Sequence, residues 1–358
     1  MRILSHDALD AARHRGDGAA DATVAALGSD KWIANALFRH LHRNDDPLPD
    51  RLPAAVRTFL AEHAPVPPWF DEGRARRAQR WASRHVLPIT AALFCASLPT
   101  AYGAARGARV LAATGRMDGA SLDRRVHETA QFVLDVLAEG GFGPDGAALR
   151  AIQKVRLLHA AIRVHLREKG LGHGEVPINQ EDLLGTLFTF STVVLRSLER
   201  LGVAIAPGEA EDYYALWRGV GAMLGVEEEL LPLDLATASD VADRIAGRQL
   251  QASDHGRMLM ASLLEGMERH LPTLRRAPRH LVRYLVGDRL ADLLAVPVDE
   301  RLRASAALWH LLPRTSRAPI ASLALGLSRS MGRPLLEMVV AAKLRDAPAS
   351  FAMPASGL

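Results

Sequence analysis

Apolar side chains recur every three or four residues along almost the whole chain, whereas alternation at every second residue is scarce. This spacing places apolar side chains on one face of an α-helix. Glycine and proline separate the periodic stretches, as helix-connecting loops require. The pattern predicts an all-α protein whose helices cover residues 30–42, 52–63, 71–84, 88–97, 100–113, 121–139, 146–168, 179–201, 209–224, 235–252, 255–270, 278–294, 300–311 and 317–346.

Several of these helices carry recognisable start signals. Ser121 is expected to cap the helix that follows it, and Asn179 precedes Glu181 and Asp182. Serine and asparagine side chains accept hydrogen bonds from free N–H groups at a helix start, and acidic residues favour the positive end of the helix dipole. We therefore expect helices to begin directly after Ser121 and Asn179.

The chain shows neither an internal repeat nor a low-complexity linker, so one large globular helical domain is the simplest organisation. Within it we expect an N-terminal helical extension over residues 1–64, a core over residues 65–300, and C-terminal helices over residues 301–358 that pack on the core. The glycine-rich stretch at residues 169–174 does not follow a strand. A dinucleotide-binding function therefore has no structural context.

Composition excludes several classes of function but does not identify one. Of 358 residues, 49% are hydrophobic and 23% charged, which is enough to build a sizeable core. The net charge of +4 arises without any continuous basic block, so we expect no nucleic-acid partner. Cys95 is the only cysteine. It excludes an internal disulfide and a cysteine-rich metal site, and a small buried hydrophobe is its expected role.

No membrane span is expected from the sequence. The longest apolar run, residues 86–98, contains Pro88 and is followed by Pro99, and it is shorter than the roughly 20 residues that cross a bilayer. The first residues lack the apolar stretch of a secretion signal. We therefore expect a cytoplasmic protein.

The helix expected over residues 146–168 carries the most informative pattern. At about 100° per residue, one stripe of this helix combines an imidazole with two guanidiniums and three aliphatic side chains. Such a stripe suits a flat amphipathic cofactor, with the imidazole on a metal and an arginine on a propionate. The alternative is an ordinary buried histidine. The stripe consists of Ile152, Val155, Arg156, His159, Ile162 and Arg163.

Residues 152–163, centred on His159, resemble the central histidine motif of the latex clearing proteins and their MpaB-like relatives. Further segments resemble this family in the same order along the chain. They are residues 98–102 and 114–116 upstream, and residues 177–184, 190–191, 217–225 and 230–232 downstream. The resemblance covers about residues 65–300, and the joint order of the segments is more specific than any single motif.

The resemblance implies an α-helical fold that encloses a haem b pocket, with dioxygen as the co-substrate. It maps the proximal iron ligand onto His159, with Arg163 supporting the haem site, and we expect Arg156 to bind the cofactor as well. Some members of the family cleave carbon–carbon double bonds of polyisoprene, and fungal relatives cleave a prenyl side chain. The expected substrate is therefore apolar, and the expected cytoplasmic location favours one small enough to enter the cell. The oligomeric state is left open.

Arg125, Glu128 and Thr129 share one face of the helix expected over residues 121–139. In latex clearing proteins the matching segment carries Arg, Lys and Thr on the distal side of the haem, so we predict these three residues to be catalytic. Glu128 departs from the family because it stands where a lysine is expected. A carboxylate can bind iron or accept a proton. The alternative is a surface pair between Arg125 and Glu128, worth a few tenths of a kcal/mol.

Three functions therefore stay open. The first is a haem b oxygenase that acts on an apolar, isoprenoid-like substrate. The second is a haem enzyme that oxidises or rearranges a small natural product, with Glu128 as the base. The third is a cofactor-free helical binding protein in which His159 is merely buried.

Overall fold

The computed structural model describes residues 4–27, 41–114, 119–170, 174–270 and 277–298. Within these ranges every regular element is a helix, and the only strand-like pairing is an isolated bridge between Ala104 and Leu250. The all-α prediction is confirmed. The helices are α1 (His6–Ala12), α2 (Gly18–Leu27), α4 (Ala54–Glu62), α5 (Glu72–Arg84), α6 (Val86–Ala92), the π-helix η2 (Leu93–Ser97), α7 (Leu98–Gly103), α8 (Ala105–Ala113), α9 (Gly119–Leu137), α10 (Ala148–Glu168), α11 (Gln180–Phe190), α12 (Thr192–Arg200), α13 (Pro207–Met223), the 3-10 helix η3 (Glu228–Leu230), α14 (Leu235–Gln249), α15 (Asp254–His270), α16 (Ala277–Val286) and α17 (Asp288–Leu293).

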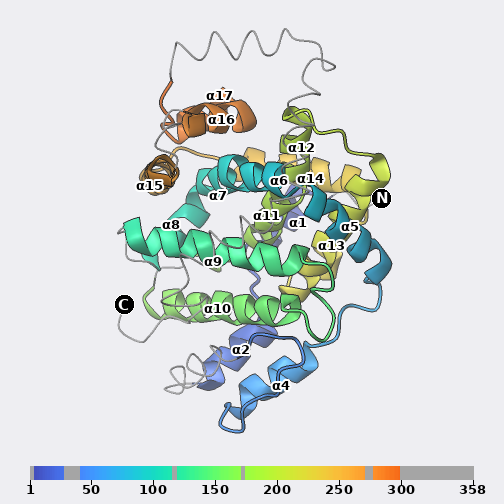
Figure 1. Ribbon diagram of the computed structural model, residues 1–358. Helices are drawn as coiled ribbons and strands as arrows, with labels where there is room; N and C mark the ends of the chain where they lie inside the picture. The colour runs from blue at the N-terminus through green and yellow to red at the C-terminus, as the bar shows by residue number, and fades with distance from the viewer. Residues whose placement is uncertain (1–3, 28–40, 115–118, 171–173, 271–276, 299–358) are drawn as a thin grey trace.

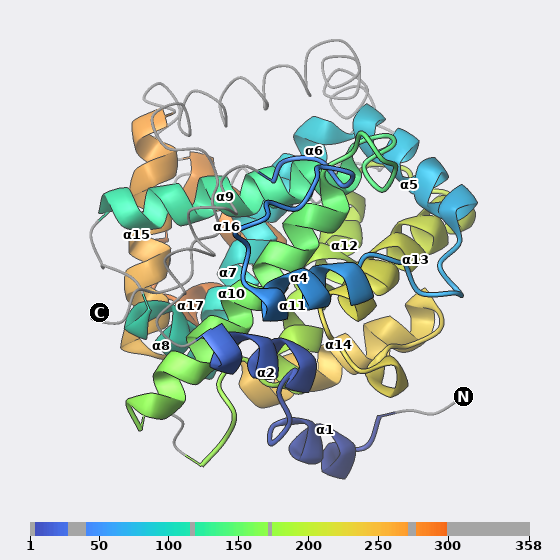
Figure 2. The ribbon, with the colours of Figure 1, turned by 90° about the horizontal axis from the view of Figure 1, so that it is seen from below.

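The long helices α9 and α10 lie side by side across the middle of the molecule (Figure 1). On one side of α10 lie α2 and α4, which are close in both views (Figures 1 and 2). The main hydrophobic core joins α10 to α11, α13 and α14 through buried side chains such as Ile152, Leu184 and Trp217. A second core, which includes Tyr102 and Met260, joins α7 to α15 and α16. Helix α10 is therefore held between the N-terminal helices and the rest of the fold.

Two of the expected helix starts have different outcomes. Asn179 caps α11 as expected, because its Oδ1 accepts a hydrogen bond of 3.0 Å from the backbone N–H of Asp182. The expected cap at Ser121 is wrong, since α9 already begins at Gly119. Both sequences carry a polar residue followed by acidic positions, so this local pattern alone does not fix the first helical residue.

Other expected helices are interrupted or joined. The helix expected over residues 179–201 is divided at Ser191, where φ is −110° and ψ is −84°. The helix expected over residues 278–294 is divided at Gly287, whose φ of 81° only glycine adopts at little cost. Helices α1 and α2 were not expected, because their apolar faces are short. The predicted helices at 300–311 and 317–346, and most of the one at 30–42, lie outside the described residues.

The apolar run at residues 86–98 continues further than the sequence predicts. Pro99 stands in the first turn of α7, where proline is tolerated, so one helical path runs from Val86 to Gly103. By length and composition this is the one segment among the described residues that could cross a membrane, with a mean hydropathy of 1.4. It is 56% buried within the fold, as expected of a core helix.

The N-terminal segment packs directly on the helices of the core. Helix α1 contacts α11, α2 contacts both α4 and α10, and a cluster of apolar side chains that includes Val24 and Leu157 joins α2 to α10. The segment expected as an N-terminal extension thus covers one side of the helix that carries His159. The C-terminal helices expected over residues 301–358 lie outside the described residues.

Candidate active site

A largely apolar cavity of about 420 Å³ lies inside the helical fold. Its volume falls within the range of about 300–1,000 Å³ that is typical of sites for small ligands and cofactors. Helices α7 to α14 and the π-helix η2 contribute to its wall, which includes Phe94, Leu158, Phe188 and Trp217. The π-helix places Phe94 and Ser97 at the wall, and single π-helical turns of this kind are frequent at functional sites.

His159 projects from α10 into the wall of this cavity, together with Val155, Leu158 and Ile162. Its Nδ1 atom is buried and has no hydrogen-bond partner among the described residues. Burial, reinforced by the positive charge of Arg163, lowers the pKa of His159 to about 4. The imidazole is therefore neutral at pH 7, and a neutral imidazole is the form that binds metals. A neutral imidazole without a partner at the wall of a mostly apolar cavity fits a cofactor that carries a metal.

Arg156 and Arg163 do not line the cavity. Arg156 forms a buried, bidentate ion pair with Asp17, with distances of 2.5 Å from Nε and 3.0 Å from Nη2 to the two carboxylate oxygens. Arg163 pairs through Nε with Asp21 at 2.6 Å. The structure therefore does not bring these guanidiniums to the cavity beside His159, and the prediction that they contact a cofactor directly gains no support from this geometry.

Helix geometry explains why the stripe separates into two flanks. At about 100° per residue, Arg156 and Arg163 lie roughly 40–60° to one side of His159, and Val155 and Ile162 lie at similar angles on the other side. The arginine flank faces the chain around α2, and the aliphatic flank faces the cavity. The roles of Asp17 and Asp21 were not predicted from the sequence. Their four-residue spacing near a helix start was the available signal, but their partners lie about 140 residues away.

Ile178 stands at the cavity wall in an unusual backbone conformation. Its φ is 50°, a left-handed value that is costly for a β-branched residue and is found mostly where surrounding structure enforces it. Arg163 donates a hydrogen bond of 3.2 Å from Nη1 to the Ile178 carbonyl. Arg163 thus connects the helix that carries His159 to the start of α11.

Arg125, Glu128 and Thr129 all reach the cavity from α9. Arg125 donates from Nη1 to the carbonyl of Leu111 at 2.9 Å, and its burial lowers the pKa of the guanidinium. The hydroxyl of Thr129 donates to the carbonyl of Arg125 at 2.9 Å. The structure therefore brings the three predicted residues to the same cavity as His159.

The alternative interpretation, a surface ion pair between Arg125 and Glu128, is wrong. Glu128 accepts a hydrogen bond of 3.1 Å from Nε of Arg124, one turn away on the same helix, and its side chain is 16% exposed. Arg125 turns instead toward the end of α8. Arg124 holds Glu128 at the edge of the cavity, so the carboxylate faces the site with one cationic partner.

Two further ionisable residues, Cys95 and Asp182, lie in this part of the fold, and only the burial of Cys95 was predicted from the sequence. Cys95 is buried as expected, does not line the cavity, and has a pKa raised to about 12 by burial, so it is a poor candidate for a thiolate ligand. Asp182 was noted only as a helix-start residue, yet it lines the cavity. Burial is the largest cause of its pKa being raised to about 6. Its position in the first turn of α11 gave no signal of either feature.

Together, the helical fold, the apolar cavity and the neutral imidazole define a helical protein with an internal site for a ligand or cofactor. Residues 83–318 match the family model described as "ER-bound oxygenase mpaB/B'/Rubber oxygenase, catalytic domain". The rubber oxygenase of Streptomyces sp. (strain K30) is 27% identical to this chain over 308 residues, which is 83% of this chain and 74% of that protein. A solved structure of latex clearing protein LCP in the closed state has a TM-score of 0.74 and 22% identity, and the match covers 93% of this chain and 90% of that one.

The family model matches more than half of the chain, so the chain belongs to the MpaB and rubber oxygenase catalytic-domain family. The protein is therefore an oxygenase, and the interpretation as a cofactor-free binding protein is set aside. The resemblance found in the sequence is confirmed, and the similarity to the latex clearing protein structure confirms the helical fold.

Proposed function

We propose that this protein is a haem b oxygenase that acts on an apolar, isoprenoid-like substrate with dioxygen as the co-substrate. The observation that carries the proposal is the neutral imidazole of His159, with a buried and unpartnered Nδ1, at the wall of a cavity of about 420 Å³. An unpaired buried polar atom costs about 1–3 kcal/mol, and binding of a metal-bearing group at the imidazole would offset part of that cost.

In this proposal His159 holds the iron, as the histidine does in many haem proteins. Bound haem iron supplies the activation of dioxygen. The chain supplies an environment that excludes water, since the wall around His159 is formed mainly by aliphatic side chains such as Val155, Leu158 and Ile162. We assign Arg156 and Arg163 an indirect role, because their pairs with Asp17 and Asp21 fix the helix on which His159 stands.

The residues on α9 are proposed to orient the reacting groups. Arg125 is fixed by its bond to the Leu111 carbonyl and can donate hydrogen bonds to an oxygen atom in the cavity. Thr129 can present its hydroxyl oxygen there while donating to the Arg125 carbonyl. Glu128 can accept a proton, because a carboxylate at this place replaces the lysine expected from the family.

The substrate is proposed from the cavity and from one relative. The Streptomyces relative is a rubber oxygenase, and rubber is a hydrocarbon polymer. The lining of this cavity suits a hydrocarbon chain. A cytoplasmic location, which we propose from the sequence, would favour a short prenyl compound over solid rubber.

A first experiment tests the cofactor. Full-length protein produced with adequate iron should be coloured and show a Soret band that shifts when dithionite is added. A colourless protein with no bound iron would contradict the proposal.

A second experiment separates two reactions of a haem enzyme. Oxidation or rearrangement of a small natural product is the alternative function, and the presence of Glu128 at the cavity favours it, since a carboxylate can accept a proton in such chemistry. Polyisoprene and short prenyl compounds should be supplied with dioxygen and the products identified. Carbonyl products from a broken double bond support cleavage, whereas oxidised products with an intact carbon skeleton support the alternative.

A further inference from the structure

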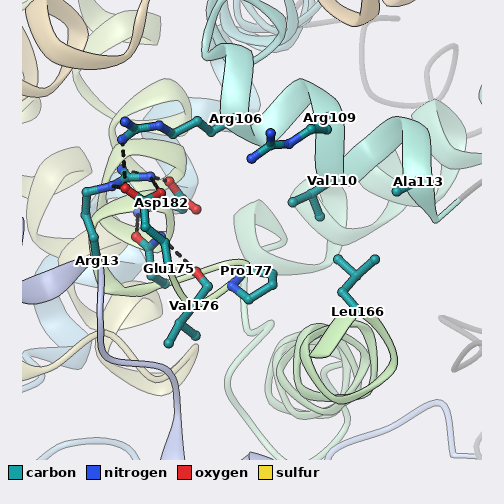
Figure 3. Close-up of a pocket in the computed structure, with 11 residues that line it drawn as sticks. Arg13, Arg106, Arg109, Val110, Ala113, Leu166, Glu175, Val176, Pro177 and Asp182 are labelled. Carbon is teal, nitrogen blue, oxygen red and sulfur yellow. Dashed lines mark hydrogen bonds and ion pairs between the residues drawn. The ribbon is translucent and has the colours of Figure 1, made fainter. Parts of the chain in front are cut away.

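Asp182, in the first turn of α11, lies between two cavities. It lines the cavity of about 420 Å³ that contains His159, and it also lines a second cavity of about 60 Å³ near α8 and the end of α10. Val110 is likewise shared by both walls. Figure 3 shows Asp182 next to Arg13 and Glu175, with Arg106 and Arg109 projecting from α8 nearby. A carboxyl group therefore stands where the two cavities adjoin.

The second cavity is suited to water. A buried water needs about 10–15 Å³ of such volume and two to four polar partners, so a cavity of about 60 Å³ has room for several water molecules. Its wall includes the charged and amide side chains of Arg13, Glu175 and Asn179 beside apolar residues, and the exposed side chains of Arg106 and Arg109 lead to solvent. The cavity around His159 is the more apolar of the two. Asp182 thus lies between a cavity with charged groups that can hold water and a more apolar one.

The surroundings of Asp182 leave its carboxylate only loosely paired. Nη1 of Arg13 lies 3.7 Å away, but the same atom donates to Glu181 at 2.9 Å. Arg13 also donates from Nε to Glu175 at 2.8 Å. From α14, Nε2 of Gln249 donates to Asp182 at 3.4 Å, which is a long hydrogen bond.

The remaining charged groups around Asp182 come from each neighbouring element. They are Glu181 on α11, Glu175 before α11, Arg106 and Arg109 on α8, and Arg248 on α14, which is paired with Glu181. Burial, with the repulsion of Glu181 and Glu175, raises the pKa of Asp182 to about 6, against the attraction of Arg13 and a hydrogen bond from the backbone of Asn179. Arg13 holds the pKa of Glu175 below its ordinary value. Asp182 can therefore change its protonation near neutral pH, whereas Glu175 stays charged.

We propose that Asp182 carries protons between water in the small cavity and the reacting groups in the cavity that contains His159. A proton that arrives from solvent through water in the small cavity adds to the carboxylate oxygen and leaves neutral water behind, and the carboxyl group gives a proton to a basic atom on the other side. The reverse direction uses the same two transfers. The net change is the movement of one proton, and nothing is oxidised or reduced. The inference rests on the proposed function, because it takes the larger cavity to be the place of reaction.

The test compares Asp182→Asn with Asp212→Asn. Asn keeps the shape of the side chain and removes its ionisation. Asp212 is a matched control, because its side chain is 13% exposed, against 14% for Asp182, and it pairs with Arg74 and Arg77 away from both cavities. Haem content should be the same in both variants. Turnover of Asp182→Asn should fall at least about a hundredfold, the lower end of the range for loss of a proton-transfer group, and should lose its dependence on pH around 6.

A second readout does not depend on the cofactor. Infrared difference spectra of the full-length protein should show a protonated carboxyl band that disappears as the pH is raised through about 6. The band should be missing in Asp182→Asn and present in Asp212→Asn. A wild-type protein without such a band would overturn the inference even if haem binds. So would a haem-loaded Asp182→Asn variant with unchanged turnover and pH profile. Wild-type protein that shows the band but never binds haem would contradict the proposed function, and with it the role of Asp182 in that reaction.

Discussion

The two flanks of α10 share one helix but differ in almost every physical property. On the flank toward α2, Arg156 and Arg163 form buried ion pairs with Asp17 and Asp21. On the flank toward the cavity, Val155 and Ile162 line the internal cavity beside His159. The charged flank fixes the helix in place, and the aliphatic flank leaves room for a ligand. The difference shows that residues beside a candidate metal-binding histidine on the helical wheel can fix the position of the helix without reaching the site.

The largest effect should come from breaking the pair on the charged flank. Arg156→Leu leaves the carboxylate of Asp17, whose side chain is 4% exposed, without its bidentate partner. Loss of one member of a buried ion pair typically costs about 3–5 kcal/mol. Urea denaturation should show this loss in the free energy of unfolding. Arg76→Leu is the control, because its pair with Glu72 is exposed and should contribute no more than about 1 kcal/mol. Equal effects in the two variants would contradict the structural role of the charged flank.

Gly225 packs against the ion pair between Arg156 and Asp17 on the charged flank of α10. Its φ is 90°, and a Cβ atom added there would lie 2.3 Å from Oδ2 of Asp17 and 3.0 Å from Nε of Arg156. Gly225→Ala should therefore destabilise the protein by about 2–3 kcal/mol through backbone strain and displacement of the ion pair. The midpoint of thermal unfolding measures it. Gly208→Ala, where an added Cβ meets nothing within 4 Å, should change the midpoint little, and a similar shift in both variants would argue against a tight contact at Gly225.

Asp182→Asn should change how stability depends on pH. In the folded protein the pKa of Asp182 is raised from 3.8 to about 6, so between these values the folded state holds a proton that the unfolded state has released. Stability is therefore lost as the pH rises through this window, and the full penalty is present above about pH 6. Asp182→Asn removes that penalty and should be more stable than wild type by about 1–3 kcal/mol at pH 7. The difference should close below about pH 4. A variant less stable than wild type at pH 7 would show that the ionised carboxylate is well paired.

The smallest effect on stability is expected on the cavity flank. Val155→Ala shortens a partly buried side chain at the cavity wall, so it removes only part of that side chain's packing and should cost about 1 kcal/mol. The same change should alter the absorption spectrum of bound haem, because Val155 lies one turn from His159. Ala161→Gly on the opposite, packed side of α10 should leave that spectrum unchanged. A large loss of stability in Val155→Ala would contradict the open character of this flank.

The sequence predicts those parts of the fold that local periodicity determines. The helices around residues 71–84, 146–168 and 209–224 lie close to their expected positions, because their apolar positions repeat over several turns. The division at Ser191 was not predicted. The hydroxyls around it bond back to carbonyls one turn earlier, as with Ser191 to Leu187 at 2.9 Å, and nothing in the local pattern marks the break.

The candidate site was predictable only where residues near in sequence determine it. His159 and the three residues on α9 reach one cavity, as expected from the helical wheel and the family resemblance. The partners of the charged groups were not predictable in the same way. Arg156 pairs with Asp17, 139 positions away, and Glu128 pairs with Arg124 in place of Arg125. Which of two adjacent arginines turns to a carboxylate depends on tertiary contacts such as that of Arg125 with the Leu111 carbonyl.

We propose that His159 holds the iron of a haem. The most direct test is His159→Gly, measured as haem per chain and by its absorption spectrum, with His165→Gly on the same helix as the control, since His165 is buried but does not line the cavity. We predict that His159→Gly loses most of its haem, that His165→Gly keeps it, and that free imidazole restores binding and the wild-type spectrum to His159→Gly alone. Full haem content with an unchanged spectrum in His159→Gly would show that another residue holds the iron.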